Sequence, residues 1–394
     1  MNTPRPHNCW IFCNVIDNFG DIGVAWRLAC ELSARLNWHV WLWLDEFPVL
    51  NRIVPDAGQH PNIRLRRWQN GHSADLCGAP EPHTVIETFA CTLPDGIRQT
   101  IRKCRPLWLN WEYLSAEDWA LRSHTMSSLQ NSGEAKYFWQ MGFLPESGGL
   151  LREAGYPAAL NNFSPSRQHA FRQNFRLPPA DPRYTDCLVF GYHSLVWADW
   201  FAALRTLGRP IRFWLADRPA ADSLHQSGLI PANALPDEGS RHVSGCLEWI
   251  RIPFVPQTRF DELLWSTDML WVRGEDSFVR AQFAGKPMFW QIYPQQEQAH
   301  LPKLDAFWHT VFTHTLPDSA FQAAFTALSG ELNGAAPLTP EERLQHWQTL
   351  LDNQSEWQRQ ATQWQRFLLA QSDAVTRLTE WMAAKGHPAG GRAA

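Results

Sequence analysis

Residues 9–23 read CWIFCNVIDNFGDIG, in which Cys9–Ile16 is an apolar run of strand length and Asp17–Gly23 (DNFGDIG) is rich in turn-forming residues. Val24–Leu36 follows, and its apolar residues recur at helical spacing. A strand, a glycine-rich turn and a helix in this order predict the first unit of a parallel, doubly wound α/β sheet.

The same pattern continues along the chain. Val40–Leu44, Thr84–Phe89 and Leu107–Trp111 are further apolar runs of strand length. Asn161–Arg183 is polar and proline-containing, which predicts a linker. After it the alternation starts again, with predicted strands at Cys187–Tyr192, Ile211–Ala216, Ile250–Val255, Met269–Val272 and Met288–Ile292, and predicted helices at Leu195–Leu207, Phe260–Ser266 and Phe278–Ala284.

A chain of 394 residues is too long for one ordinary core. We therefore predict two Rossmann-like doubly wound domains, residues 1–180 and 181–384, that face each other across a cleft and bind ligands at the carboxyl ends of their strands. Residues 339–384 have helical spacing, and the last helix is free to pack back on the first domain. Residues 385–394 are rich in Gly and Pro and predict a disordered tail.

The composition excludes several functions. The net charge is −4, the pI is near 6.4 and no basic stripe is present, so we expect no nucleic-acid binding. Eight scattered Cys without C-x-x-C, and fifteen His without H-E-x-x-H, argue against structural zinc and a disulfide framework. The 22 Trp lie mostly in apolar runs, which favours core packing. Without a signal peptide or a membrane-spanning run, we expect a cytoplasmic protein with no membrane contact.

The Asp17–Gly23 segment lies between a strand and a helix, where α/β folds bind ligands. Gly20 and Gly23 would let the backbone approach a ligand closely. Asp17 and Asp21 would repel a pyrophosphate, so this pattern favours a catalytic or acceptor-binding loop over a phosphate cradle. The alternative is a plain turn with an N-cap aspartate.

Arg273–Ser277 (RGEDS) is the counterpart in the second half, between a strand and a helix. Backbone N–H groups there, together with the Ser277 hydroxyl, are able to hold a diphosphate. Glu275 is too acidic to face phosphate, but it is suited to accept hydrogen bonds from sugar hydroxyls. The alternative is that Asp276 and Ser277 are only helix caps.

Aromatic residues follow two predicted strands of the second half. Phe254, with Phe260 close behind it, is placed to sandwich a base, and Phe190 and Tyr192 end another strand. The alternative is that these rings belong to the core or are simply exposed. The sequence contains no P-loop, kinase signature or Ser-His-Asp order.

Four segments together resemble the EarP family, protein-arginine rhamnosyltransferases that act on translation elongation factor P. These segments are DNFGDIGVAWRLA (17–29), LNWEYLSAEDW (109–119), IPFVPQTRFDELLW (252–265) and VRGEDSFVRAQFAGKPMFWQIYPQQEQAH (272–300). The resemblance spans nearly the whole chain. It implies a GT-B fold, the donor dTDP-β-L-rhamnose, inverting transfer, and one loop arginine of elongation factor P as acceptor. The sequence has no evident D-x-D metal motif, so we expect an enzyme that needs no metal or other cofactor.

The resemblance also implies roles for individual residues. Asp17 and Asp21 would be a catalytic pair with Asp21 the better candidate for the base, and Glu275 would be essential at the sugar–diphosphate end. The substrate-binding set would comprise Asn18, Phe19 and Gly20 in the first half, Tyr192, Asp276 and Ser277 at the diphosphate, Phe254, Phe260 and Gln257 around thymine, and Phe190.

Elementary chemistry limits how such acids can act. A protonated guanidinium is a poor nucleophile, and its pKa exceeds that of a normal aspartate by about 8.6 units, or roughly 12 kcal/mol. The acids would therefore first orient the guanidinium, and the proton would leave late, as the C–N bond forms. A helix N-terminus can stabilise the leaving diphosphate without metal.

Three alternatives stay open at this point. One is a GT-B glycosyltransferase with a small-molecule or glycan acceptor. Another is a non-catalytic protein that binds elongation factor P. The third is a sugar-nucleotide epimerase of the same two-domain architecture.

Overall fold

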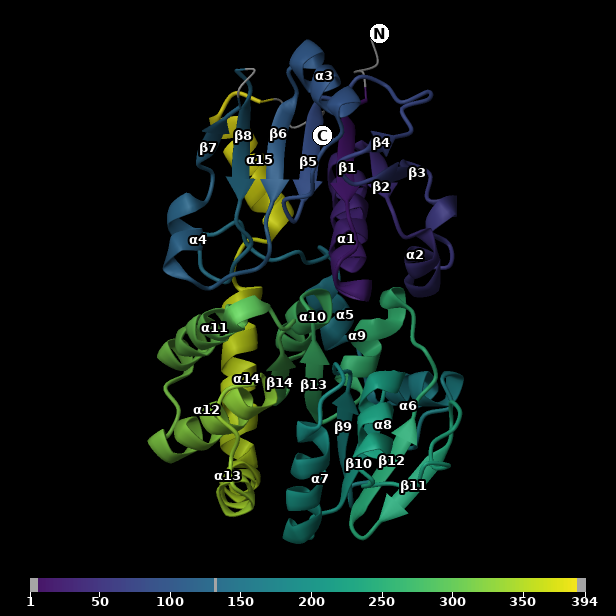
Figure 1. The fold of residues 1–394 in the computed structure, drawn as a ribbon, viewed down its shortest axis with the longest axis vertical. Coiled ribbons are helices and arrows are strands. Elements are labelled where there is room, and N and C mark those ends of the chain that lie inside the picture. The colour runs from purple at the N-terminus through teal and green to yellow at the C-terminus, as the bar shows by residue number, and fades with distance from the viewer. Residues whose placement is uncertain (1–5, 131–132, 388–394) are drawn as a thin grey trace. The chain divides into compact units, whose positions relative to one another are not determined.

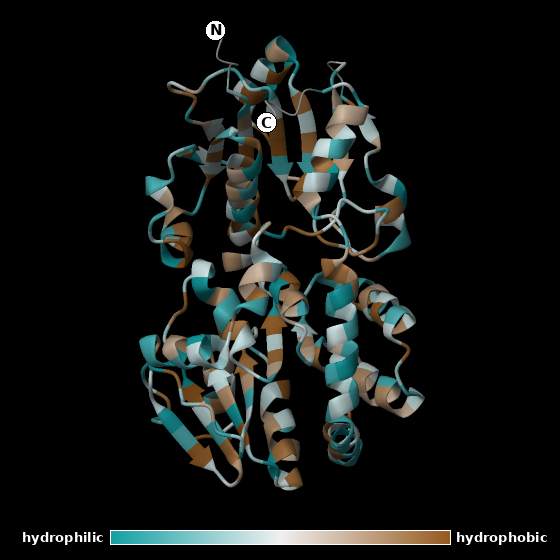
Figure 2. Cartoon of the chain, turned by 180° about the vertical axis from the view of Figure 1, so that it is seen from behind, coloured by the Kyte–Doolittle hydropathy of each residue, from teal (hydrophilic) through white to brown (hydrophobic). Residues whose placement is uncertain are grey.

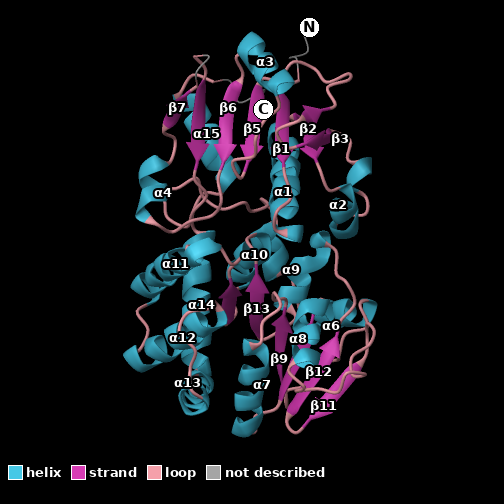
Figure 3. Ribbon diagram, in the orientation of Figure 1, coloured by secondary structure: helices cyan, strands magenta, loops and turns pink. Residues whose placement is uncertain are grey.

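The structure is a computed structural model that describes residues 6–130 and 133–387 (Figure 1). The chain divides into two compact units: the first comprises residues 1–154 and 371–394, and the second is Gly155–Ala370. Each unit is an open α/β sheet with helices packed on it, as Figure 3 shows by the magenta strands and cyan helices. The class predicted from the sequence, α/β with two Rossmann-like domains, is confirmed.

The sheet of the first unit has eight strands in the order β4-β3-β2-β1-β5-β6-β8-β7. Six of them are parallel, and β4 and β7 are antiparallel at the edges. The strand order reverses between β1 and β5, which makes that gap the topological switch point. The strands are β1 (Asn8–Cys13), β2 (His39–Leu44), β3 (Ile63–Gln69), β4 (Ser73–Ala74), β5 (Thr84–Thr88), β6 (Leu107–Trp111), β7 (Ser127–Leu129) and β8 (Ala135–Trp139).

Helices cover both faces of this sheet. On one face, Ile97 and Ile101 of α3 pack into a buried cluster with Trp10, Phe12 and Trp108. On the other face, Trp381 of α15 contacts the rings of Tyr137 and Trp139. The helices are α1 (Asn18–Leu36), α2 (Phe47–Ile53), α3 (Asp95–Cys104), α4 (Asp118–Ser123) and α15 (Ala374–Ala384), with a 3₁₀ turn at Ala57–Gln59.

The sheet of the second unit has six strands in the order β11-β12-β10-β9-β13-β14. All pairs are parallel except that of the edge strand β11 with β12. Here the order reverses between β9 and β13, so this gap is the second switch point. The strands are β9 (Thr185–Val189), β10 (Ile211–Leu215), β11 (Arg241–Ser244), β12 (Leu247–Arg251), β13 (Met269–Arg273) and β14 (Met288–Gln291).

An aromatic core fixes the helices of the second unit to its sheet. Trp271 of β13 contacts Trp200 of α7 and Trp347 of α13, with ring centroids 5.3 and 5.7 Å apart. The helices are α5 (Tyr156–Asn161), α6 (Pro165–Asn174), α7 (Val196–Leu207), α8 (Arg218–Gln226), α9 (Gln257–Trp265), α10 (Asp276–Ala284), α11 (His300–Thr315), α12 (Ser319–Leu332), α13 (Pro340–Asp352) and α14 (Gln354–Leu369), with a 3₁₀ turn at Gln296–Gln298.

The tryptophans form cores, as predicted. Trp119, at 51% exposure, is the one tryptophan among the exposed large hydrophobic residues of the described chain. In Figure 2 the strands show brown bands mixed with white and teal, and the helices alternate between polar and apolar residues. The inner strands β1, β5, β6, β10 and β13 are buried along nearly their whole length, as two-sided burial of a parallel sheet requires.

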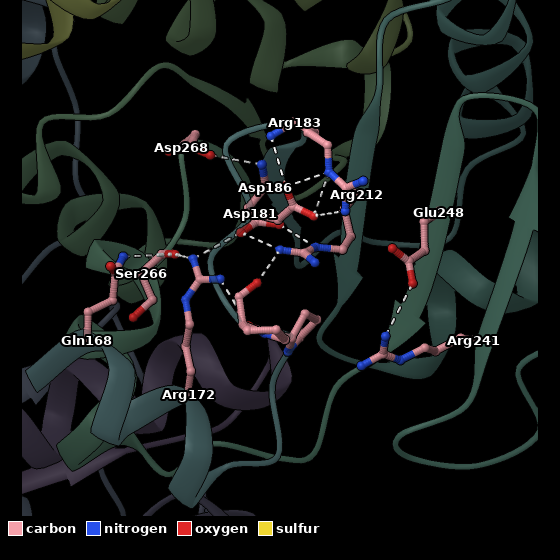
Figure 4. Close-up of polar contacts among 12 residues, drawn as sticks. Gln168, Arg172, Asp181, Arg183, Asp186, Arg212, Arg241, Glu248, Ser266 and Asp268 are labelled. Atoms are coloured by element: carbon pink, nitrogen blue, oxygen red, sulfur yellow. Dashed lines mark hydrogen bonds and ion pairs between the residues drawn. The ribbon is translucent and has the colours of Figure 1, made fainter. Parts of the chain in front are cut away.

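The boundary between the units lies before the predicted linker, because part of that linker is helical and belongs to the second unit. Arg172 of α6 donates to the carbonyls of Ser266 and Pro178 and pairs with Asp186 at 2.9 Å (Figure 4). Asp186 also pairs with Arg212 at 2.6 Å. The first segment of the first unit therefore ends at residue 154 and not at the expected residue 180, and α15 belongs to that unit.

Two further expectations concern the chain as a whole. All eight cysteines, which lie in described parts of the chain, are unpaired. Across residues 6–130 and 133–387, no helix is long and apolar enough to cross a membrane. The predicted disordered tail falls almost entirely at residues 388–394, outside the described residues.

Candidate active site

The two motifs singled out from the sequence lie at the two switch points. Asp17–Gly23 follows β1, which borders the gap between β1 and β5. Arg273–Ser277 includes the end of β13 and the start of α10, and borders the gap between β9 and β13. Each unit therefore carries a candidate ligand site where doubly wound sheets bind ligands.

Asp17 and Asp21 are joined through the backbone at the start of α1. Oδ2 of Asp21 accepts hydrogen bonds from the N–H groups of Ile16, at 2.7 Å, and Asp17, at 2.9 Å. Asp21 is 3% exposed, whereas Asp17 is partly exposed at the N-cap position, where its side chain makes no capping hydrogen bond. The buried acid thus holds the segment that presents the more exposed acid.

The predicted turn at Asp17–Gly23 is wrong in one respect, because α1 already begins at Asn18. Gly20 and Gly23 are helical, so their role is not to reverse the chain. A β-carbon on Gly20 would lie 2.9 Å from Oδ2 of Asp17. Glycine at this position therefore leaves room for the Asp17 carboxylate, at the usual cost of glycine within a helix.

The other predicted residues of this segment lie in the first turn of α1. Asn18 is its first residue, and the ring of Phe19 lies 5.4 Å from the guanidinium carbon of Arg52. Oδ1 of Asp45, just after β2, accepts the N–H of Val15 at 3.0 Å.

Burial raises the pKa of the Cys13 thiol, and the nearby charge of Asp21 raises it further. Cys13 is therefore a core thiol and not a nucleophile.

Aromatic residues lie at the neighbouring strand ends of the first unit. Phe89 follows β5 and stacks on Tyr113, which follows β6, with ring centroids 4.3 Å apart. Phe89 and Ala90 have φ values of 57° and 51°, in the left-handed region that side chains rarely adopt. Backbone strain of this kind is often found at functional sites. No role was predicted for this pair from the sequence, because only glycine is a clear sequence signal for positive φ.

In the second unit, the chain turns at Gly274 and enters α10 through Glu275 and Asp276. Gly274 has φ +63°, and its carbonyl accepts Nε1–H of Trp290 at 2.8 Å. Glu275 is the N-cap residue of α10. The Ser277 hydroxyl donates back to the carbonyl of Arg273, so in this state it stabilises the helix start.

Several predicted substrate-binding residues come together around this helix start. Nε2 of Gln257 donates to Oδ2 of Asp276 at 2.8 Å. The rings of Phe190 and Phe260 meet edge to face at 5.9 Å. Phe254 is half-buried in the loop between β12 and α9. The second-unit part of the predicted set thus lies at the carboxyl ends of β9, β12 and β13.

Arg273 organises the aromatic side of this site. Its guanidinium carbon lies 4.7 Å from the ring centroid of Phe190 and 4.8 Å from that of Tyr192, and it pairs with Asp217 at 2.8 Å. Tyr192 is fixed in turn by Gln291, whose Oε1 accepts its N–H at 2.7 Å. Arg273 lies within the RGEDS motif, but no role was predicted for it from the sequence.

Glu275 has a cationic partner that was not predicted from the sequence. Nζ of Lys303, in the first turns of α11, donates to Oε1 of Glu275 at 2.7 Å. The two side chains are only 14% and 16% exposed. Nothing in the spacing of the sequence links these residues, which lie 28 positions apart.

In the described parts of the chain, no group of three or more His, Cys, Asp or Glu side chains is arranged to hold a metal ion. The two sites therefore consist of carboxylates in the first unit, and of a helix start, paired cations and aromatic rings in the second. Such a division suits an acceptor that needs a base and a donor that carries a nucleobase and a diphosphate.

Two Rossmann-like units with sites at their switch points define the GT-B fold class. The structure is similar to that of MurG from Acinetobacter baumannii, with a TM-score of 0.52 and 13% identity over 96% of this chain and 99% of that one, which shows the fold alone.

Sequence comparison defines the family. The family model described as Elongation-Factor P (EF-P) rhamnosyltransferase EarP matches residues 9–383. A protein-arginine rhamnosyltransferase of Neisseria meningitidis serogroup B is 46% identical over 386 residues, which are 97% of this chain and 98% of the relative. The chain belongs to the EarP family, and it is an enzyme of the glycosyltransferase class.

A solved structure supports the same assignment. It is described as the structural basis for EarP-mediated arginine glycosylation of translation elongation factor EF-P. It has a TM-score of 0.66 and 27% identity, and the match covers 96% of this chain and 99% of that one. The resemblance noted from the four sequence segments is thereby confirmed.

Proposed function

We propose that this enzyme transfers L-rhamnose from dTDP-β-L-rhamnose, with inversion, to one arginine side chain of translation elongation factor P. Membership of the EarP family is the observation that carries the proposal. Rhamnosyl transfer to a protein arginine is the activity that the name of the Neisseria relative states. The donor and the stereochemistry are the finer parts of the proposal. Because the acceptor works in translation, we also propose that the enzyme acts in the cytoplasm.

The acids at the start of α1 would act on the acceptor. In this proposal, Asp17 and Asp21 orient the guanidinium through charge-assisted hydrogen bonds, and Asp21 takes the proton as the C–N bond forms. The hydrogen bonds from Ile16 and Asp17 to Oδ2 of Asp21 fix the direction of that carboxylate. A fixed base loses little entropy when the arginine arrives.

The second unit would bind the donor. In this proposal, the first N–H groups of α10 and the side chains of Asp276, Ser277 and Tyr192 hold the diphosphate, and Gln257 acts with the phenylalanines on the thymidine side. To bind phosphate, the Ser277 hydroxyl would have to turn away from the Arg273 carbonyl. The helix start would stabilise the leaving diphosphate, and we propose that no metal is needed.

The product itself tests the proposal. Elongation factor P incubated with the enzyme and dTDP-β-L-rhamnose should gain one deoxyhexose at a single arginine, located by fragmentation mass spectrometry. NMR of the modified peptide should show an α-linked rhamnose. A β-linkage would overturn inversion. Transfer to small-molecule or glycan acceptors without modification of elongation factor P would overturn the proposed acceptor.

A further inference from the structure

The ion pair between Lys303 and Glu275 is largely buried at the end of β13 where the donor would bind. Its Nζ–Oε1 distance is 2.7 Å, and both side chains are less than one-fifth exposed. Neither charge is well solvated there, so each depends on the other. A buried pair of this kind is costly to break, because the remaining charge is left uncompensated.

Hydrogen bonds between the start of α11 and the end of β14 fix the position of Lys303. His300, in the first turn of α11, is 6% exposed, and its ring bridges the N–H of Gln295, at 3.1 Å, and the carbonyl of Asn333, at 2.9 Å. Asn333 in turn bonds the carbonyl of Trp290 and the N–H of Ile292, both at 2.8 Å. The start of α11 is thus fastened to the end of β14.

The pair also resolves an electrostatic conflict at this site. Glu275 is the N-cap of the helix start that is proposed to hold a diphosphate, and a carboxylate there would repel the phosphates. Arg273, the other buried cation at this strand end, already pairs with Asp217 at 2.8 Å. Lys303, whose Nζ lies 2.7 Å from Oε1 of Glu275, is a cation that can neutralise the charge of Glu275.

We infer that Lys303 is a positioning residue for donor binding: it holds Glu275 in place and cancels its charge, so that a nucleoside diphosphate can bind beside a carboxylate. This inference rests on the proposed function, because it assumes that the end of β13 is the donor site. It predicts coupling between the two residues: loss of Lys303 should weaken diphosphate binding only while Glu275 is charged.

The test is a double-mutant cycle on dTDP affinity, measured by calorimetry with the full-length protein. Lys303→Gln should weaken dTDP binding about 10-fold or more, and Lys303→Arg should remain within about threefold of wild type. Glu275→Gln should bind dTDP at least as well as wild type does, although its turnover falls. Lys303→Gln/Glu275→Gln should bind within about threefold of Glu275→Gln.

The control is Arg359→Gln, which breaks a cation–carboxylate pair with Glu356 on α14 that is more exposed. It should leave dTDP affinity unchanged. Wild-type affinity in Lys303→Gln, or a double variant as weak as Lys303→Gln alone, would overturn the inference. If Lys303→Gln does not fold, the charge-conserving variant Lys303→Arg provides the test, and loss of its dTDP binding would overturn the inference. Absence of dTDP binding to the wild type would instead overturn the proposed donor.

Discussion

The backbone N–H of Asp17 donates a 2.9 Å hydrogen bond to Oδ2 of Asp21, so the position of Asp17 depends on the side chain of Asp21. The same oxygen accepts the N–H of Ile16 at 2.7 Å. Substitutions at Asp21 therefore act in two ways, on the chemistry and on the placement of Asp17. A substitution at residue 21 that keeps an oxygen able to accept these two hydrogen bonds distinguishes the effect on the chemistry from the effect on the placement of Asp17.

Asp21→Asn should retain the fold, because the amide oxygen can still accept both backbone hydrogen bonds, but it removes the proposed base. We expect kcat to fall about 100-fold or more. The kcat of Asp21→Ala should fall at least as far. This variant should also have a lower thermal midpoint, because two backbone donors lose their partner. Rates and melting curves for both variants make the comparison. Near-wild-type turnover by Asp21→Asn would remove Asp21 as the base.

Gly20→Ala should lower turnover without lowering stability greatly. The new β-carbon would lie 2.9 Å from Oδ2 of Asp17 and would displace that carboxylate. Alanine favours the helix by about 1 kcal/mol, which offsets part of the clash. We expect kcat to fall about 10-fold, since misplacement of a catalytic group by a small distance is costly.

The matched control is Gly96→Ala in α3, where an added β-carbon would meet no atom within 4 Å and φ is not in the left-handed range. This variant should be as active as wild type. Equal activity of Gly20→Ala and Gly96→Ala would show that the position of Asp17 does not matter for turnover.

The sequence predicted the sheets well because buried parallel strands are continuous apolar runs. Leu107–Trp111 was predicted with its observed bounds. The start of α1 was misplaced because two glycines in Asp17–Gly23 suggested a turn. In the structure Gly20 is kept small by a contact with Asp17, which local sequence preference does not reveal.

The site was predictable only where the chain itself brings residues together. Glu275, Asp276 and Ser277 are adjacent, and a strand-to-helix transition was enough to place them. Lys303 reaches Glu275 only because α11 is fastened to the sheet through His300, and Phe89 reaches Tyr113 across two strand ends. Such contacts depend on tertiary packing, and no periodicity encodes them.

Glu31 on α1 should make stability depend on pH. It is 6% exposed, and burial, reinforced by the charge of Glu153, raises its pKa to about 7 from an ordinary 4.5. The folded state therefore binds the proton more tightly than the unfolded state does, and the stability contributed by the protonated form is lost as pH rises from about 4.5 to about 7.

Glu31→Gln removes that titration and should be more stable than wild type at pH 8 by about 1–3 kcal/mol. Near pH 4 the two proteins should differ little, because Glu31 is then mostly protonated in both the folded and the unfolded state. Urea unfolding of both proteins at the two pH values measures the difference. The same difference at both pH values would show that Glu31 does not titrate as inferred.

Chelation should leave transfer intact. The proposed donor site stabilises the diphosphate with the helix start of α10, so excess EDTA should change the initial rate by less than about twofold. The measurement is the rate of elongation factor P modification with and without EDTA. Loss of activity that Mg²⁺ restores would contradict the proposal.

The most direct test is the intact mass of elongation factor P after incubation with dTDP-β-L-rhamnose and either the wild-type enzyme or Asp21→Asn. The wild type should add one deoxyhexose, and Asp21→Asn, although folded and able to bind dTDP, should add almost none in the same time. An unchanged mass with the wild type, or equal modification by both proteins, would contradict the account.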